Sequence, residues 1–160
     1  MQESDREKKF VQLAAEFELD LSEPPASGGL YAPAVIEDHV AYLSGQIPKI
    51  GDIVLFTGKV GDDLTLEQAK RASAICALRA VSVLKHTMGS LDAVRKVLRM
   101  NVYVQAGEGF AEHTQVADGA SKIFHEIFGN AAGHARTAVG VPGLPRNAAV
   151  EVDIQVALLP

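Results

Sequence analysis

Two charged residues near the C-terminal end of the chain have the types and spacing of a site for small acids. Arg136 is flanked by small or weakly polar residues, and its planar guanidinium suits a carboxylate bound in a bidentate manner. Glu151 follows fifteen residues later, on the strand face opposite Val150 and Val152. If the two residues end adjacent strands, one can bind an anion while the other orients a water molecule. An ordinary surface salt bridge is the alternative that this spacing leaves open.

Other residues and motifs of the sequence suggest little further chemistry. On a strand, His134 lies on the same side as Arg136 and could contact a bound anion; the alternative is a partly exposed histidine before the strand begins. Cys76 lies in an apolar run, which indicates a buried small side chain rather than a reactive thiol. The sequence contains no P-loop, dinucleotide fingerprint, zinc-ligand spacing or G-x-S-x-G motif. We therefore expect neither a metal nor a nucleotide cofactor.

Three helices and several short strands are predicted to position these residues. Helices are expected over residues 4–18, which begin with a capping box, over 66–88 before Gly89, and over 110–128 before Gly129. Strands are expected over residues 39–44, 53–57, 100–105, 136–141 and 150–158, with a shorter segment at 92–98 leading into the third. The strands do not follow regular βαβ spacing. This order favours an α+β fold, with an antiparallel-rich mixed sheet and helices packed on one face.

Length and composition limit the classes of function. The chain has 160 residues, 48% of them hydrophobic and 22% charged, which predicts one soluble domain over residues 1–160 with an N-terminal helix at about 4–18. A net charge of −5 argues against nucleic acid as a partner. No apolar run approaches the roughly 18 residues of a membrane span, and the charged N-terminus does not resemble a signal peptide. We expect a cytoplasmic protein that does not bind membranes.

Three blocks of sequence resemble the YjgF/Rid family, the reactive intermediate deaminases, whose members are also described as endoribonuclease L-PSP-like. The strongest block is A-R-T-A-V-G-V at residues 135–141, which continues to Leu144-Pro145 and to V-E-V at 150–152. The other blocks are S-G-Q-I-P at residues 44–48 and G-L-Y-A-P-A-V at residues 29–35. In order, they extend over residues 29–158, most of the chain.

The resemblance implies a fold, an assembly and an activity. The fold is like that of bacterial chorismate mutase, and the assembly is a homotrimer with ligand clefts between neighbouring subunits. The activity is hydrolysis of 2-imino or enamine acids to 2-keto acids and ammonia, without a cofactor. In this chain Arg136 would bind the substrate carboxylate and Glu151 would hold the attacking water. Tyr31 would line the cleft, and Ser44 and Gly45 would form the loop beside it.

The chain also departs from the family pattern. Ala138 stands where a cysteine is frequent, and residues 116–119, V-A-D-G, stand where the deaminase branch has a helical asparagine. Asp118 is a candidate replacement for that asparagine. These features, with the N-terminal helix, resemble the family's longer branch. Two other functions remain open: a non-catalytic trimer that binds keto acids or other small carboxylates, and an endoribonuclease, which the acidic net charge and scattered histidines disfavour.

Overall fold

A computed structural model describes residues 4–160 of the chain, and residues 1–3 of the expected domain 1–160 lie outside the described part. The helices and strands follow one another as α1 (Asp5–Glu16), β1 (Ala34–Glu37), β2 (Val40–Leu43), β3 (Lys49–Ile50), β4 (Ile53–Val54), α2 (Leu66–Met88), β5 (Val94–Gln105), α3 (His113–Phe128), β6 (Ala135–Val141) and β7 (Val150–Leu158).

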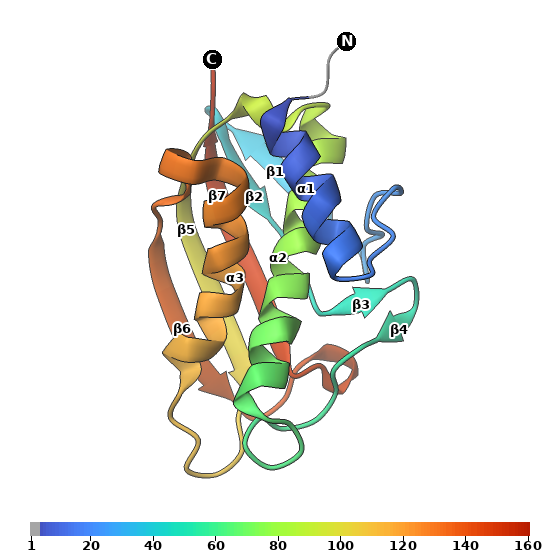
Figure 1. Ribbon diagram of the computed structural model, residues 1–160, viewed down its shortest axis with the longest axis vertical. Coiled ribbons are helices and arrows are strands. Elements are labelled where there is room, and N and C mark those ends of the chain that lie inside the picture. The colour runs from blue at the N-terminus through green and yellow to red at the C-terminus, as the bar shows by residue number, and fades with distance from the viewer. Residues whose placement is uncertain (1–3) are drawn as a thin grey trace.

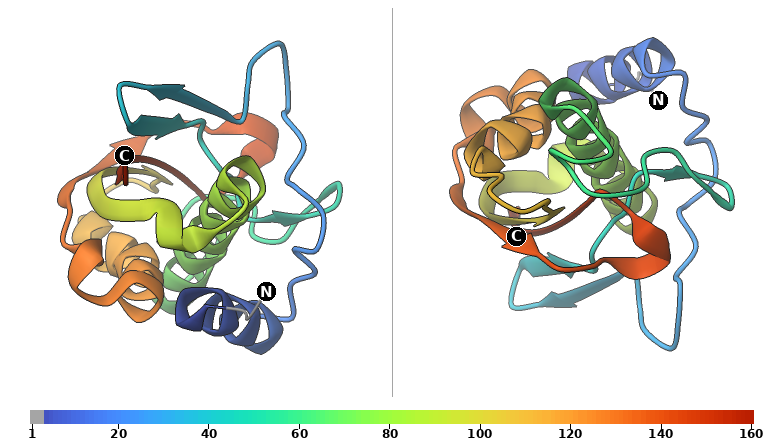
Figure 2. Two further views of the ribbon diagram at one scale, coloured as in Figure 1. Left: turned by 90° about the horizontal axis from the view of Figure 1, so that it is seen from above. Right: turned by 90° about the horizontal axis from the view of Figure 1, so that it is seen from below.

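One five-stranded sheet organises the molecule, in the order β1-β2-β7-β5-β6 (Figure 1). β5 and β6 are parallel, and the other neighbouring pairs are antiparallel. α2 and α3 lie side by side against one face of this sheet, and the views along the long axis show both on the same side (Figure 2). The predicted α+β class, with an antiparallel-rich mixed sheet and helices on one face, is confirmed.

Local capping explains where the helices begin and end. In α1, the Ser4 hydroxyl accepts a bond from the Glu7 amide while the Glu7 carboxylate accepts one from the Ser4 amide, as the predicted capping box requires. Thr65 and Gln68 form the same reciprocal pair at the start of α2. That helix ends at Gly89, whose φ of 76° is a left-handed conformation that glycine adopts without strain.

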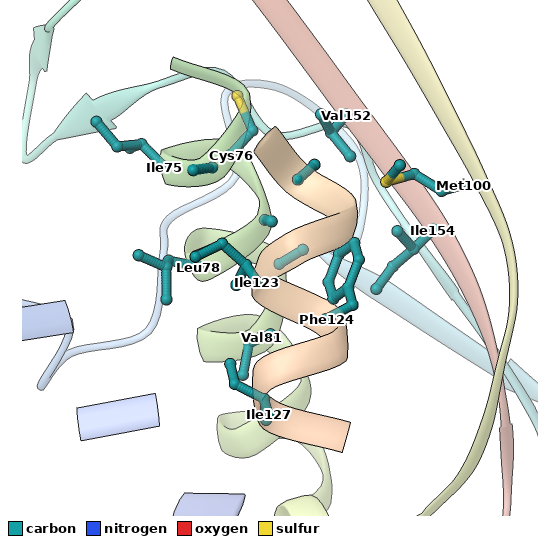
Figure 3. Packing of buried hydrophobic residues seen from close by; sticks show 14 of the residues in the cluster. Ile75, Cys76, Leu78, Val81, Met100, Ile123, Phe124, Ile127, Val152 and Ile154 are labelled. Atoms are coloured by element: carbon teal, nitrogen blue, oxygen red, sulfur yellow. The ribbon is translucent and has the colours of Figure 1, made fainter. Parts of the chain in front are cut away.

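An apolar core between the helices and the sheet holds the central strands in place (Figure 3). Phe124 of α3 faces Met100 of β5 and Ile154 of β7, and all three are fully buried or nearly so. Burying a side chain of this size stabilises the fold by about 1.5–3 kcal/mol. Cys76 is fully buried, as predicted, and its thiol lies 3.7 Å from the Val150 carbonyl oxygen.

The structure corrects several predicted strands. The segments expected at 92–98 and 100–105 form one strand, β5, which follows a 3-10 turn at residues 91–93. Two register shifts against β7, between Val94 and Lys96 and between Val97 and Arg99, interrupt its alternation and hide this continuity in the sequence. β1 and β3 were not predicted. In β1 three of the four residues are exposed, so no alternating pattern marks it.

Candidate functional site

Tyr31, Gly45 and Glu151, three of the six predicted site residues, line one cavity of about 280 Å³. The cavity lies where the loop before β1, the chain leaving β2 and the first residues of β7 meet. Its full lining is Ala26, Ser27, Gly28, Tyr31, Pro33, Gly45, Gln46, Ile47, Lys49, Arg79, Pro145, Arg146 and Glu151.

Glu151 is the carboxylate of this cavity. Its side chain is half-buried, and burial raises the pKa of its carboxyl, with a smaller contribution from the negative charge of Asp153. Within residues 4–160 it forms no ion pair. A carboxylate in this environment binds a proton more readily than an exposed one, which suits a general base.

Gly45 allows the loop backbone to approach that carboxylate. A Cβ atom at this position would overlap the Glu151 Oε1 atom and contact the rest of its side chain. Only glycine therefore fits here while Glu151 keeps its place.

Ser44 and Tyr31 stabilise the loop around the cavity. The Ser44 hydroxyl does not line the cavity; it donates a 2.7 Å hydrogen bond to the Ala32 carbonyl oxygen. The Tyr31 hydroxyl accepts a 3.1 Å bond from the Gly28 amide, and the side chain remains 52% exposed. Tyr31 lines the cavity and is therefore accessible to a ligand that enters it.

Arg136 lies elsewhere, on the helix-covered face of the sheet. It is opposite Met100 in the parallel β5–β6 pair, so its side chain points towards α3. Its Nη1 donates to the Asp118 carboxylate at 2.7 Å and to the Ser121 hydroxyl at 3.0 Å, and its Nη2 donates to the Thr114 carbonyl at 3.3 Å. A guanidinium has five N–H donors, so Nε and one Nη2 hydrogen are left for a ligand.

His134 belongs to this second group. Its Nε2 lies 3.0 Å from the same Ser121 hydroxyl that accepts from Arg136. His134 is partly exposed and precedes β6, which begins at Ala135, so its position matches the alternative of a histidine before the strand. Its Nδ1 is close to the Ala132 carbonyl oxygen. Burial lowers the pKa of His134, aided by smaller electrostatic contributions from the neighbouring His125 and Arg136, and so favours the neutral imidazole at neutral pH.

The structure does not bring Arg136 and Glu151 together. The expected adjacency of their strands is wrong, because β5 lies between β6 and β7. Glu151 is opposite Tyr103 of β5 and shares the open face with it, whereas Arg136 is opposite Met100 on the covered face. Strands two positions apart are separated by roughly 10 Å. The salt bridge proposed as the alternative does not form either: Arg136 pairs with Asp118 instead.

Sequence reasoning missed three cations that line the Glu151 cavity: Lys49, Arg79 and Arg146. Arg79 could have been recognised as a candidate from the sequence, because it is a charged residue within the apolar run of the helix at 66–88. Lys49 begins the two-residue strand β3 and Arg146 lies in a short 3-10 helix at residues 145–147, and the sequence gives no sign of what either side chain faces.

No helix among residues 4–160 is long and apolar enough to cross a membrane. In the same residues, no group of three or more His, Cys, Asp or Glu side chains is arranged to hold a metal ion.

Comparisons with known proteins identify the family. A sequence model described as "YjgF/chorismate mutase-like, putative endoribonuclease" matches residues 10–158. Protein TCP17 of Trypanosoma cruzi is 41% identical over 129 residues, which are 80% of this chain and 81% of that protein. The crystal structure of Atu1372 from Agrobacterium tumefaciens is 32% identical, with a TM-score of 0.86 over 96% of this chain and 92% of that one.

A more distant structure shares the fold. E. coli TdcF, solved with bound serine, has a TM-score of 0.61 and 17% identity, and the match covers 88% of this chain and 98% of TdcF. The match to the family model over residues 10–158 confirms the resemblance, and the chain belongs to the YjgF/chorismate mutase-like family.

Proposed function

We propose that the protein hydrolyses small 2-imino or enamine acids to 2-keto acids and ammonia. The observation that carries this proposal is the shared cavity of Tyr31, Gly45 and Glu151, in which burial raises the pKa of the one carboxyl group. Such a group can hold a water molecule by hydrogen bonding and accept its proton at a pH where an exposed carboxylate would be a weaker base.

Hydrolysis of an imine needs only modest catalysis by the protein. The water oxygen forms a bond to C2 of the imine, and the electron pair of the C=N bond moves to nitrogen. Glu151 takes a proton from the water and returns it to the nitrogen, which gives a carbinolamine. Glu151 then moves the hydroxyl proton of the carbinolamine to the nitrogen, the oxygen electron pair forms the C=O bond as the C–N bond breaks, and ammonia leaves. Positioning the water beside C2 supplies a proximity effect, and proton transfer in the transition state is worth typically 10²–10⁴-fold.

Arg136 completes the proposed site as the group that binds the substrate carboxylate. In one chain it does not line the Glu151 cavity and lies on the other face of the sheet. A ligand that contacts both residues must therefore lie between two copies of the chain. This requirement supports a homotrimer with clefts between subunits, each cleft taking Arg136 from one subunit and Glu151 from its neighbour.

The site favours a small acid over RNA as the substrate. The family description includes endoribonuclease, but the chain carries a net charge of −5 and the half-buried carboxylate of Glu151 lines a cavity of about 280 Å³. TdcF, of the same fold, binds serine, a small molecule with a carboxylate. A non-catalytic binder of keto acids would use the same residues and would differ only in lacking turnover.

The test is turnover on freshly generated 2-iminobutanoate, followed as release of 2-oxobutyrate above the uncatalysed rate. We expect activity in the wild type and none in Arg136→Ala, with Arg136→Lys failing to restore it because an ammonium cannot bind a carboxylate in bidentate fashion. Arg99→Ala, which removes another arginine of the same region, is the matched control and should keep its activity. Wild-type binding of 2-oxobutyrate without turnover would instead establish the non-catalytic binder.

A further inference from the structure

We infer that the substrate carries a second carboxylate, which binds to a cluster of cations inside the Glu151 cavity. The inference rests on the proposed function and narrows its substrate class to 2-imino or enamine dicarboxylic acids. Lys49, Arg79 and Arg146 all line this cavity, and Glu151 is the one acidic residue of its lining. The cavity is therefore positively charged overall.

Arg79 is the strongest member of the cluster. Only 5% of it is exposed, yet its guanidinium forms no ion pair with any residue in 4–160. Its Nη1 donates a 2.9 Å bond to the Lys49 carbonyl oxygen, while its Nε is buried without a hydrogen-bond partner. Buried charges are normally paired, because removing them from water is costly. An anion in the adjoining cavity would supply the missing partner.

The other two cations are also without counterions. The one hydrogen bond of the Arg146 side chain goes to the Asp52 carbonyl oxygen, and neither Lys49 nor Arg146 forms an ion pair within the described chain. Arg146 has a φ of 56°, a left-handed conformation that is unusual for a bulky residue.

Nearby acidic residues do not neutralise the cluster. Lys49 and Arg79 also line a neighbouring cavity, which contains Asp20, Glu23 and Asp52, but none of these carboxylates pairs with either cation in the structure. The positive charge thus remains available to a ligand.

The arrangement assigns each end of the ligand to a different group. Arg136 of one subunit would bind the carboxylate next to the imine, and Glu151 of the other would hold the water at C2. The distal carboxylate would then extend into the cavity towards Arg79 and Arg146. A guanidinium binds a carboxylate through two parallel, charge-assisted hydrogen bonds, and each of these arginines uses only one of its N–H groups on a backbone carbonyl in the structure.

Calorimetry with two acids of equal chain length tests the inference. 2-Oxoglutarate should bind the wild type at least about tenfold more tightly than 2-oxopentanoate, the gain expected from one charge-assisted contact. Arg79→Met and Arg146→Met should each lower this ratio towards one, because they weaken binding of 2-oxoglutarate more than that of 2-oxopentanoate. Arg95→Met, which removes an exposed arginine outside the cavity, should keep the ratio. If Arg79→Met does not fold, the exposed Arg146 position decides the outcome.

The results separate this inference from the proposed function. Equal affinity of the wild type for the two acids, with both lost in Arg136→Ala, would overturn the dicarboxylate inference and leave the proposed function standing. A preference that survives in both cavity variants would also overturn it. Failure of the wild type to bind or turn over either class of acid would overturn both.

Discussion

Arg136 and Glu151 lie on opposite faces of the same sheet, with β5 between their strands. Their fifteen-residue spacing in the sequence therefore does not build a site within one chain. Each residue has its own surroundings: Arg136 donates hydrogen bonds to Asp118 and Ser121 of α3, and Glu151 lies against the loop at Gly45. Two half-sites of this kind suit a cleft between subunits.

Glu151→Gln should lower kcat by about 10²-fold or more, because the amide cannot accept the proton of the attacking water. Binding of 2-oxobutyrate should change little, since Glu151 does not hold the carboxylate. Single-turnover rates and calorimetry on the same variant compare the loss of rate with the change in binding. A variant with unchanged rate and tighter binding would show that Glu151 only balances positive charge.

The pH dependence of kcat/KM should report the same carboxyl. Because burial raises the pKa of Glu151, the rate should fall on the acid side at a pH above the ordinary glutamate range. The pKa of Glu151 is higher in the folded state than in the unfolded state. The ionised carboxylate therefore lowers the stability of the folded protein at neutral pH, and protonation removes this loss as the pH falls. The acid limb should be absent in Glu151→Gln. An acid limb at an ordinary glutamate pKa would contradict the assignment.

Gly45→Ala should reduce activity about as much as Glu151→Gln, because its Cβ would overlap the Glu151 carboxylate and displace it. The matched control is Gly143→Ala, where an added Cβ meets no atom within 4 Å and the backbone is not left-handed. Circular dichroism checks that both variants fold, and their initial rates give the comparison. Full activity in Gly45→Ala would show that Glu151 moves without consequence.

Asp118→Asn should strengthen binding of 2-oxobutyrate a few-fold. The Asp118 carboxylate partly neutralises Arg136 across 2.7 Å, but its side chain is 58% exposed, so the pair is worth no more than about 1 kcal/mol. Glu126→Gln removes an equal charge from the same helix, from the exposed pair with Lys122, and serves as the control. Weaker binding in Asp118→Asn alone would mean that Asp118 positions Arg136 for the ligand.

Much of the fold could be predicted because local signals and tertiary packing agree. The helix at 66–88 has a capping pair, an apolar period and Gly89, and the strand at 150–158 alternates between core and open face. β5 was divided wrongly because its two register shifts disturb that alternation. β1 carries no pattern, since it is an exposed edge strand.

The site was less predictable than the fold. The sequence and the family resemblance pointed to Tyr31, Gly45 and Glu151, which the structure places in one cavity. Strand order is a long-range property, so the insertion of β5 between the strands of Arg136 and Glu151 could not be read from spacing. The contact of Arg136 with Asp118 likewise depends on how α3 packs across β6.

Mixing two inactive variants tests the central claim most directly. Arg136→Ala supplies intact Glu151, and Glu151→Gln supplies intact Arg136, so a mixed oligomer regains whole clefts if each cleft takes one residue from each of two subunits. After unfolding and refolding together in equal amounts, the mixture should recover about one quarter of wild-type activity, because the two subunits of each cleft are drawn independently. Mass spectrometry of the intact complexes would verify that mixed oligomers form. Mixed oligomers with no more activity than either variant alone would contradict a site shared between subunits.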